Sequence, residues 1–275
     1  MNDLFSIVYG QAQLCAVLIA LAYAALAAHG WLHAGDNKPA HWLQAALISV
    51  ATAHTLLLSA TVWMPHHSGG IALSLGFAQA LSLATCVGVW LFIIESRWVA
   101  IDGLRPLALS LPTVAVLLAA WIVPTPAVLH SGAALHVLVA IAAHGVALLA
   151  CGHGVLLLAL NRVLKNGATT GWAQILARQC PPLVVLERLL IRLSLWVAAL
   201  LAATVGLGLL AGILKIDHKT VLTVMSLLAW LAVPWGYQRR GWRGAKLCTA
   251  VLVATGLLIL AYIGSRFVLQ AVLHR

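Results

Sequence analysis

Charged side chains are scarce in this sequence. Only 8% of its 275 residues are Asp, Glu, Lys or Arg, whereas charged residues make up about 25% of a typical soluble domain. Hydrophobic residues account for 63%, and the mean hydropathy is +1.03. A soluble globular protein is therefore excluded, and the chain is predicted to be an integral membrane protein.

Acidic residues and paired cysteines are the next absences. With six Asp and Glu residues, the chain has few groups for hydrolytic or phosphoryl-transfer chemistry, and it shows no Ser/His/Asp set and no phosphate-binding glycine loop. We expect no enzymatic activity. The five cysteines stand singly, without C-x-x-C or C-x-x-C-H, which argues against thiol redox chemistry and against covalent haem attachment.

No polar segment is long enough to form a soluble domain. The longest polar connection runs from Arg162 to Arg188, well short of the smallest domains of about 50 residues. Residues 1–275 are therefore predicted to form a single polytopic transmembrane domain. A membrane-spanning helix needs about 20 apolar residues, and the windows predict an all-α bundle of about eight helices near residues 4–28, 41–63, 71–94, 106–122, 132–160, 187–213, 219–237 and 246–268.

The distribution of Lys and Arg predicts the orientation. The formal net charge is +10, but the basic residues fall between the spans, so we expect contact with anionic lipid and not with nucleic acid. Twelve of the 16 Lys and Arg residues lie on the side of the odd-numbered loops. The positive-inside rule places those loops in the cytoplasm and both termini outside, in the periplasm.

The connections between spans carry their own signals. Loops near 64–70 and 123–131 contain prolines and no charge, which indicates stiff connections at the outer interface. Within the long inner loop, Trp172 to Leu176 is predicted to form a short interfacial helix. Glu187 is predicted to pair with the adjacent Arg188 at a helix start, and the Trp- and Gly-rich turn from Trp235 to Gly244 is expected at the cytoplasmic surface.

Four histidines lie inside stretches that are otherwise almost entirely Leu, Ala and Val: His54, His136, His144 and His153. An imidazole in hydrocarbon needs a partner for its N–H and offers its second nitrogen to a metal, so these residues are candidate functional groups. With both termini outside, His136 falls near the outer end of its helix and His54 near mid-bilayer, so the two could cluster in the outer half, and they are the best pair for haem iron. Hydrogen bonds to the backbone of a neighbouring helix would explain the same two residues. His144 and His153 are interpreted as residues that fill polar contacts inside the bundle or that belong to a proton or ligand path.

Two further residues are candidate contacts at the outer face. His218 belongs to a polar cluster with Lys215, Asp217 and Lys219, and Arg266 lies near the outer end of the last helix. Their positive side chains could meet the propionates of a haem in the outer half. An ordinary solvated loop and a snorkelling arginine explain the same residues equally well.

Several segments together resemble the YpjD-type inner-membrane proteins, which are grouped with HemX and, more distantly, with the CcsA and CcmC cytochrome c assembly proteins. The segments are PPLVVLERLL from Pro181, HKTVLTVMSLLAWL from His218, WGYQRRGWRG from Trp235, AYIGSRFV from Ala261 and, in the first half, AHTLLL around His54. The resemblance implies an eight-helix, haem-handling protein of the bacterial inner membrane. ALHV at His136 matches the family's histidine that opens a helix at the outer face, His54 matches one in the second span, and His218 matches one that some members replace.

One departure limits what this resemblance implies. CcsA and CcmC proteins present haem on an outer W-G-x-x-W-x-W-D segment, which this chain lacks. Delivery of haem to apocytochrome c is therefore not implied, whereas haem binding is.

The leading hypothesis is a haem-binding protein that holds haem b in the outer half of the bundle. His136 and His54 would be axial ligands of the iron, with His218 and Arg266 as secondary contacts, and cytochrome-assembly or haem-pathway proteins would be partners. Two alternatives stay open. One is a transporter or channel for a small solute or proton that uses His54, His144 and His153, and the other is an assembly scaffold without a cofactor.

Overall fold

The structure is a computed structural model that describes residues 2–32, 41–65, 71–122, 126–128, 131–167, 171–177, 180–214 and 217–264. Eight helices in these ranges are long and apolar enough to cross a membrane. They are α1 (Asn2–Leu32), α2 (His41–Val62), α3 (Phe77–Glu95), α4 (Arg105–Trp121), α5 (Ser131–Asn166), α7 (Leu183–Leu210), α8 (His218–Arg239) and α9 (Ala245–Ile259), which continues into the π turn η2 (Leu260–Gly264). The eight predicted spans are confirmed.

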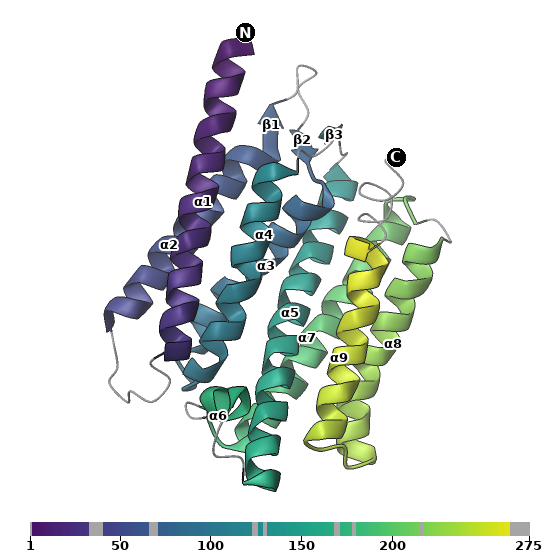
Figure 1. The fold of residues 1–275 in the computed structure, drawn as a ribbon. Helices are drawn as coiled ribbons and strands as arrows, with labels where there is room; N and C mark the ends of the chain where they lie inside the picture. The colour runs from purple at the N-terminus through teal and green to yellow at the C-terminus, as the bar shows by residue number, and fades with distance from the viewer. Residues whose placement is uncertain are drawn as a thin grey trace.

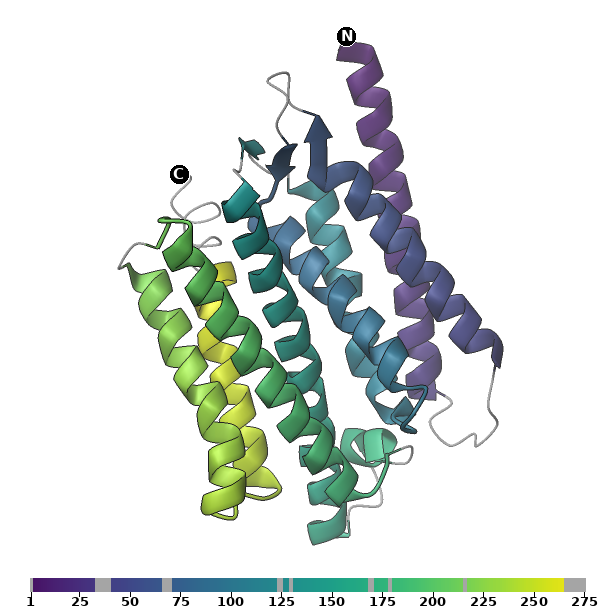
Figure 2. The ribbon, with the colours of Figure 1, turned by 180° about the vertical axis from the view of Figure 1, so that it is seen from behind.

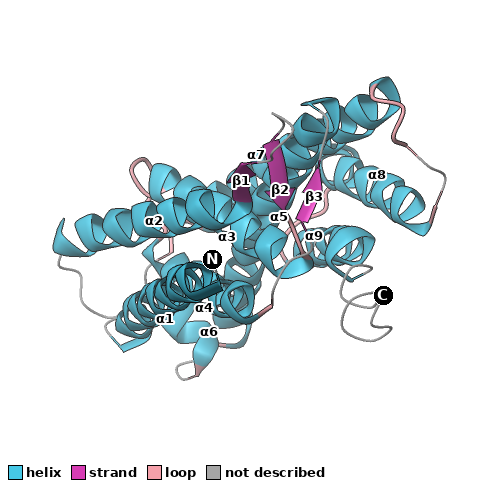
Figure 3. Cartoon of the chain, turned by 90° about the horizontal axis from the view of Figure 1, so that it is seen from above, coloured by secondary structure: helices cyan, strands magenta, loops and turns pink. Residues whose placement is uncertain are grey.

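The spans form two groups that meet at α5. In the first group α1 packs on α4 and α2, and α3 packs on α2 and α4; in the second, α8 packs on both α7 and α9. Helix α5 contacts α7 and α9 on one side and α3 on the other, so it joins the two groups (Figures 1 and 3). Any site built on α5 can therefore draw side chains from both halves.

The two ends of the bundle differ. The strands lie at the same end of the bundle as the start of α1 and the last turn of η2 (Figures 1 and 2). The short helix α6 (Trp172–Ala177) lies at the opposite end. The predicted short helix from Trp172 is thus confirmed. The first and last described segments lie at one end, as an even number of spans requires. Which side of the membrane this end faces stays a prediction from the charge distribution.

A small sheet replaces two of the predicted irregular connections. Strands β1 (Trp63–Pro65), β2 (Ile71–Ser74) and β3 (Pro126–Val128) pair in the order β1-β2-β3, with both pairs antiparallel. Residues 71–74 were predicted as the start of a helix, and this prediction is wrong. Their backbone pairs with segments on both sides, so the connection after α2 and the connection after α4 satisfy each other's hydrogen bonds.

Local backbone signals shape the connection between α7 and α8. Helix α7 ends with Gly212 in the left-handed region, at φ 64°, and the amides of Ile213 and Leu214 donate to the carbonyl oxygen of Gly208, at 3.1 Å each. Helix α8 begins at Asp217, whose carboxylate accepts the amide hydrogen of Thr220 at 2.9 Å. This turn brings the start of α8 back against α7, beside the first turns of α5.

Candidate functional site

A cavity of about 230 Å³ lies between α5, α7, α8 and the end of α9. Its walls are mainly apolar, with polar groups from each helix. Two histidines of α5, three threonines and a tyrosine are among the lining residues, which are His136, Ala140, His144, Leu201, Thr204, Val205, Ile213, Leu214, Asp217, Lys219, Thr220, Thr223, Leu258, Ala261 and Tyr262. An apolar cavity with a few convergent polar groups is the usual form of a small-molecule or cofactor site.

His136 is anchored in this cavity through one ring nitrogen. Its Nδ1 lies 2.8 Å from the carbonyl oxygen of Thr204 on α7. A carbonyl only accepts, so Nδ1 carries the hydrogen, and in the neutral ring Nε2 keeps a lone pair. This is the arrangement that metal-ligating histidines use, in which the second nitrogen is fixed by a backbone carbonyl.

The close approach of His136 to α7 depends on a glycine. A Cβ atom placed on Gly208 would lie 3.2 Å from both Cε1 and Nδ1 of the His136 ring. Because Gly208 has no side chain, the imidazole can lie against the backbone of α7 and reach Thr204. Gly208 could not be recognised as a site residue from the sequence, because nothing in the spacing of residues along the chain connects it with His136.

His144 lines the same cavity two helical turns beyond His136. Its side chain is 7% exposed, its Nδ1 lies 2.7 Å from the carbonyl oxygen of Ala140, and its ring packs edge-on against Tyr262 with centroids 5.9 Å apart. Nε2 is buried and makes no hydrogen bond to a described residue; the Leu258 carbonyl lies near the ring but outside hydrogen-bond geometry. The structure therefore places His144 in the candidate site, although the sequence interpretation gave it a packing or path role.

The polar residues at the start of α8 lie at one wall of the cavity. Asp217 and Lys219 both line it, whereas His218 between them is exposed and does not. The hydrogen bond from the Thr220 backbone amide is the main reason why the pKa of Asp217 lies below its ordinary value. Lys219 thus supplies a cation where the cavity meets this loop. Arg266 and Lys215, also named from the sequence, lie outside the described residues.

His54 lies elsewhere, among the helices of the first group. Its side chain is fully buried. Nδ1 lies 3.3 Å from the hydroxyl of Tyr23 on α1, and Nε2 lies 2.9 Å from the hydroxyl of Ser82 on α3. Both ring nitrogens are therefore engaged, and His54 does not line the cavity that holds His136. The structure does not bring together the two histidines that the sequence paired, because His54 contacts α1 and α3 of the first group whereas His136 contacts α7 of the second.

Glu187 also has a partner other than the predicted one. Its carboxylate accepts hydrogen bonds from the Arg243 guanidinium at 3.1 Å and from the Gly244 amide at 3.0 Å, while Arg188 is exposed. The predicted Glu187–Arg188 pair is wrong because adjacent residues on a helix point in different directions. The carboxylate instead fastens the turn between α8 and α9 to the start of α7.

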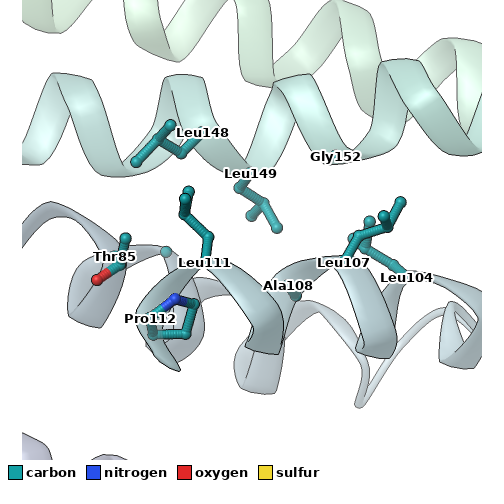
Figure 4. Close-up of a pocket in the computed structure, with 10 residues that line it drawn as sticks. Thr85, Leu104, Leu107, Ala108, Leu111, Pro112, Leu148, Leu149 and Gly152 are labelled. Atoms are coloured by element: carbon teal, nitrogen blue, oxygen red, sulfur yellow. The ribbon is translucent and has the colours of Figure 1, made fainter. Parts of the chain in front are cut away.

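A second, smaller cleft lies between α3, α4 and α5. It has a volume of about 40 Å³, and Figure 4 shows leucines of α5 and α4 pointing toward one another across it. The labelled side chains include Leu148, Leu149, Leu107, Leu111 and Pro112, and none of the lining residues is ionisable. This cleft has no group that could ligate a metal.

Donors for a bare metal ion do not gather in the described part of the chain. Within the described ranges, no three His, Cys, Asp or Glu side chains come together in a metal-binding group. The imidazoles of the cavity are better suited to iron that already carries four ligands from a porphyrin, because such iron needs only one or two axial ligands.

The chain is similar to curated proteins over most of its length. It is 25% identical over 249 residues to the inner membrane protein YpjD of Escherichia coli, an alignment that covers 86% of this chain and 90% of that protein. It is 29% identical over 255 residues to an uncharacterized 28.8 kDa protein in the nifR3-like 5′ region of Azospirillum brasilense, covering 89% of this chain and 85% of that protein. No protein-family model matches. No solved structure matches either.

These similarities agree with the eight spans of the structure. The predicted location is confirmed: the chain is a multi-pass protein of the inner membrane, similar to a YpjD inner-membrane protein along most of its length.

Proposed function

We propose that this inner-membrane protein binds haem b in the cavity between α5, α7, α8 and α9, with His136 as an axial ligand of the iron. The observation that carries the proposal is the His136–Thr204 contact of 2.8 Å. It fixes the tautomer and the direction of the ring before any ligand enters, and it leaves Nε2 as the basic nitrogen of a residue that lines the cavity.

The other lining residues would suit the apolar ring and the charged propionates of a porphyrin. Leu201, Val205 and Leu258 supply apolar wall, which excludes water from a macrocycle. Lys219 offers a positive charge where the cavity meets the α7–α8 loop, and a charge-assisted hydrogen bond to a propionate is among the stronger interactions available. Bound haem would supply iron redox chemistry, while the chain would set its orientation and surroundings.

His144 would not bind the same iron atom as His136. The two residues are eight positions apart on one helix, about 12 Å along its axis, so their imidazoles would hold different parts of a ligand. His218 is exposed beside the cavity and, with Arg266, is retained as a proposed secondary contact. His54 as a ligand stays a prediction from the sequence that this proposal does not use, because both of its ring nitrogens are bonded to other side chains.

The proposed role is haem trafficking, haem-linked regulation or support of cytochrome assembly. This role follows from the resemblance to proteins grouped with HemX, CcsA and CcmC, and cytochrome-assembly or haem-pathway proteins would be the partners. A transporter that uses intramembrane histidines and a cofactor-free scaffold are the competing functions.

The absorbance spectrum of the full-length protein tests the proposal. The protein is expressed with ample haem and purified in detergent, and a Soret band with split reduced α and β bands is expected. In His136→Ala the Soret band should be lost or strongly reduced, while size-exclusion profile and thermal unfolding stay close to wild type. His218→Ala, at an exposed position near the cavity, is the comparison variant and should retain more of the band than His136→Ala.

Two results would overturn the proposal. A colourless wild-type protein would remove haem binding and leave the transporter and scaffold hypotheses. A Soret band that is the same in wild type and His136→Ala would show that His136 is not a ligand.

A further inference from the structure

His153 on α5 meets Glu95, the last residue of α3. The Nε2 atom of His153 lies 3.1 Å from the Oε2 atom of Glu95. The His153 side chain is fully buried and that of Glu95 is 15% exposed. Two ionisable groups from neighbouring helices thus come together within the spans, at the end of the bundle away from the strands.

The state of the imidazole follows from its other nitrogen. His153 Nδ1 lies 3.0 Å from the carbonyl oxygen of Leu149, so Nδ1 carries a hydrogen. In a neutral ring Nε2 would then be a lone-pair acceptor. An ionised Glu95 would place a second acceptor, Oε2, against this nitrogen. Neither Nε2 nor Oε2 makes a regular hydrogen bond to any described residue. Two buried acceptors at this distance repel each other, and a proton shared between Nε2 and Oε2 replaces the repulsion with a hydrogen bond.

The position of Glu95 makes an unprotonated pair still less favourable. Glu95 ends α3, and the C-terminus of a helix carries partial negative charge, which disfavours a carboxylate. Among the described ion pairs no arginine or lysine reaches Glu95. His153 is therefore the only positive partner that these pairs provide for it.

The other charged groups near this end of α5 are engaged elsewhere or exposed. Arg105 on α4 pairs with Asp102 of the short 3₁₀ turn η1 (Asp102–Leu104), and Arg162 on α5 lies over the Trp172 ring of α6. Glu187 on α7 accepts from Arg243. The exposed basic residues include Arg97, two positions after Glu95, and Arg188, Arg192 and Lys246 on α7 and α9.

We propose that His153 and Glu95 form a proton-binding site that holds one proton, in addition to the Nδ1–H, at neutral pH. The proton resides on Nε2, giving an imidazolium beside a carboxylate, or on Oε2, giving a carboxylic acid beside a neutral imidazole. The ligand of this site is the proton itself. The site is separate from the proposed haem cavity, because neither residue lines that cavity, and it does not depend on haem binding.

Two spectra of the full-length protein at pH 7 locate the proton. Nitrogen NMR of ¹⁵N-histidine-labelled protein reports whether His153 is protonated on both nitrogens, with His153→Gln assigning its signals. Infrared spectra with and without ¹³C-glutamate report a carboxylic acid. The chain has only two glutamates, Glu95 and Glu187, and Glu187 accepts two hydrogen bonds as a carboxylate, so an isotope-shifted acid band identifies Glu95.

Either a doubly protonated His153 ring or a glutamic acid band supports the proposal. In Glu95→Gln, whose amide can donate to Nε2, the signature should disappear and His153 should become a neutral ring. The matched control is His144, which also directs Nδ1 to the carbonyl four residues before it but faces no carboxylate in the described ion pairs. His144 is expected to keep an unprotonated Nε2.

The proposal is overturned if wild-type His153 has an unprotonated Nε2 and no glutamic acid band is present in the same sample. It is also overturned if the wild-type signature, whether a doubly protonated His153 ring or a glutamic acid band, persists in Glu95→Gln. The wild-type spectra decide the first point even if the variant fails to fold.

Discussion

The Nδ1 atom of His136 donates its hydrogen to the carbonyl oxygen of Thr204, so an imidazole from α5 is fixed on the backbone of α7 at 2.8 Å. This contact joins the helix that connects the two halves of the bundle to one wall of the cavity. It also sets which nitrogen of His136 can act as a ligand.

Gly208→Ala should weaken the proposed haem site without unfolding the protein. The added methyl group would lie 3.2 Å from the His136 ring, so the ring must shift, and the shift should disturb its hydrogen bond to Thr204. Loss of such a supporting hydrogen bond typically lowers metal affinity by about 10-fold or more. Haem titration followed by the Soret band measures the change.

Gly206→Ala is the matched control for that variant. It lies two residues earlier on the same helix, and a Cβ atom there meets nothing within 4 Å. Haem affinity should be unchanged. Equal losses of haem affinity in Gly206→Ala and Gly208→Ala would show that a general change in α7, and not the contact with His136, causes the loss.

His54→Ala should lower stability and leave the haem spectrum unchanged. The substitution removes the hydrogen bonds to Tyr23 and Ser82, and each buried hydroxyl left without a partner costs about 1–3 kcal/mol. Thermal unfolding and the Soret band are measured on the same sample, with Thr52→Ala at an exposed position of α2 as control. A lost Soret band at unchanged stability would instead favour His54 as a ligand, as the sequence alone predicted.

Glu187→Ala should loosen the turn between α8 and α9. Glu187 is 2% exposed and accepts from Arg243 and from the Gly244 amide. Removing it leaves a buried amide unsatisfied, at a cost of about 1–3 kcal/mol. Hydrogen exchange of the Gly244 amide should become faster and the unfolding temperature lower.

Arg188→Ala distinguishes the observed contact of Glu187 with Arg243 and Gly244 from the Glu187–Arg188 pair that the sequence predicted. Arg188 is exposed and takes no part in the contact, so stability should change by no more than about 0.5 kcal/mol. A loss as large as that of Glu187→Ala would contradict the assignment.

Asp217→Ala should fray the first turn of α8. The Asp217 side chain caps this helix by accepting from the Thr220 amide, and removal of such a cap costs about 1 kcal/mol. Asp217→Asn keeps the acceptor and should be close to wild type at neutral pH. Hydrogen exchange at Thr220 reports the change.

The same cap should depend on pH in a defined direction. The pKa of Asp217 is lowered from an ordinary value of 3.8, chiefly by the Thr220 backbone hydrogen bond. The charge-dependent part of the cap is therefore fully present above about pH 4 and is lost as pH falls through the lower folded-state pKa. Protection at Thr220 that rises on acidification would be the opposite of this expectation.

The membrane spans were predictable from local composition. A run of about 20 apolar residues, such as the one that became α7, satisfies its backbone within one helix, so the prediction needs no knowledge of neighbours. Residues 71–74 were mispredicted for the same reason. Their apolar composition fits a helix or a strand, and pairing with β1 of the same connection and with β3 of the connection after α4 decides between the two.

The contacts of the histidines could not be predicted from local sequence alone. His136 and His144 could be placed on one broad face of a helix from their spacing of eight residues, and the structure puts both in one cavity. Their Nδ1 partners, however, lie on α7 for His136 and on α5 itself for His144. The choice between these partners depends on how closely α7 approaches, which Gly208 permits.

By itself, the sequence determined that this chain is a multi-pass helical membrane protein and which few ionisable residues lie within its hydrocarbon-spanning segments. These properties depend on composition over one helix length. Only the tertiary structure decided that His136 shares a cavity with His144, that His54 bonds to Tyr23 and Ser82, and that His153 meets Glu95. The rotation and approach of packed helices determine these contacts, because residues far apart in the chain become neighbours only when the helices pack.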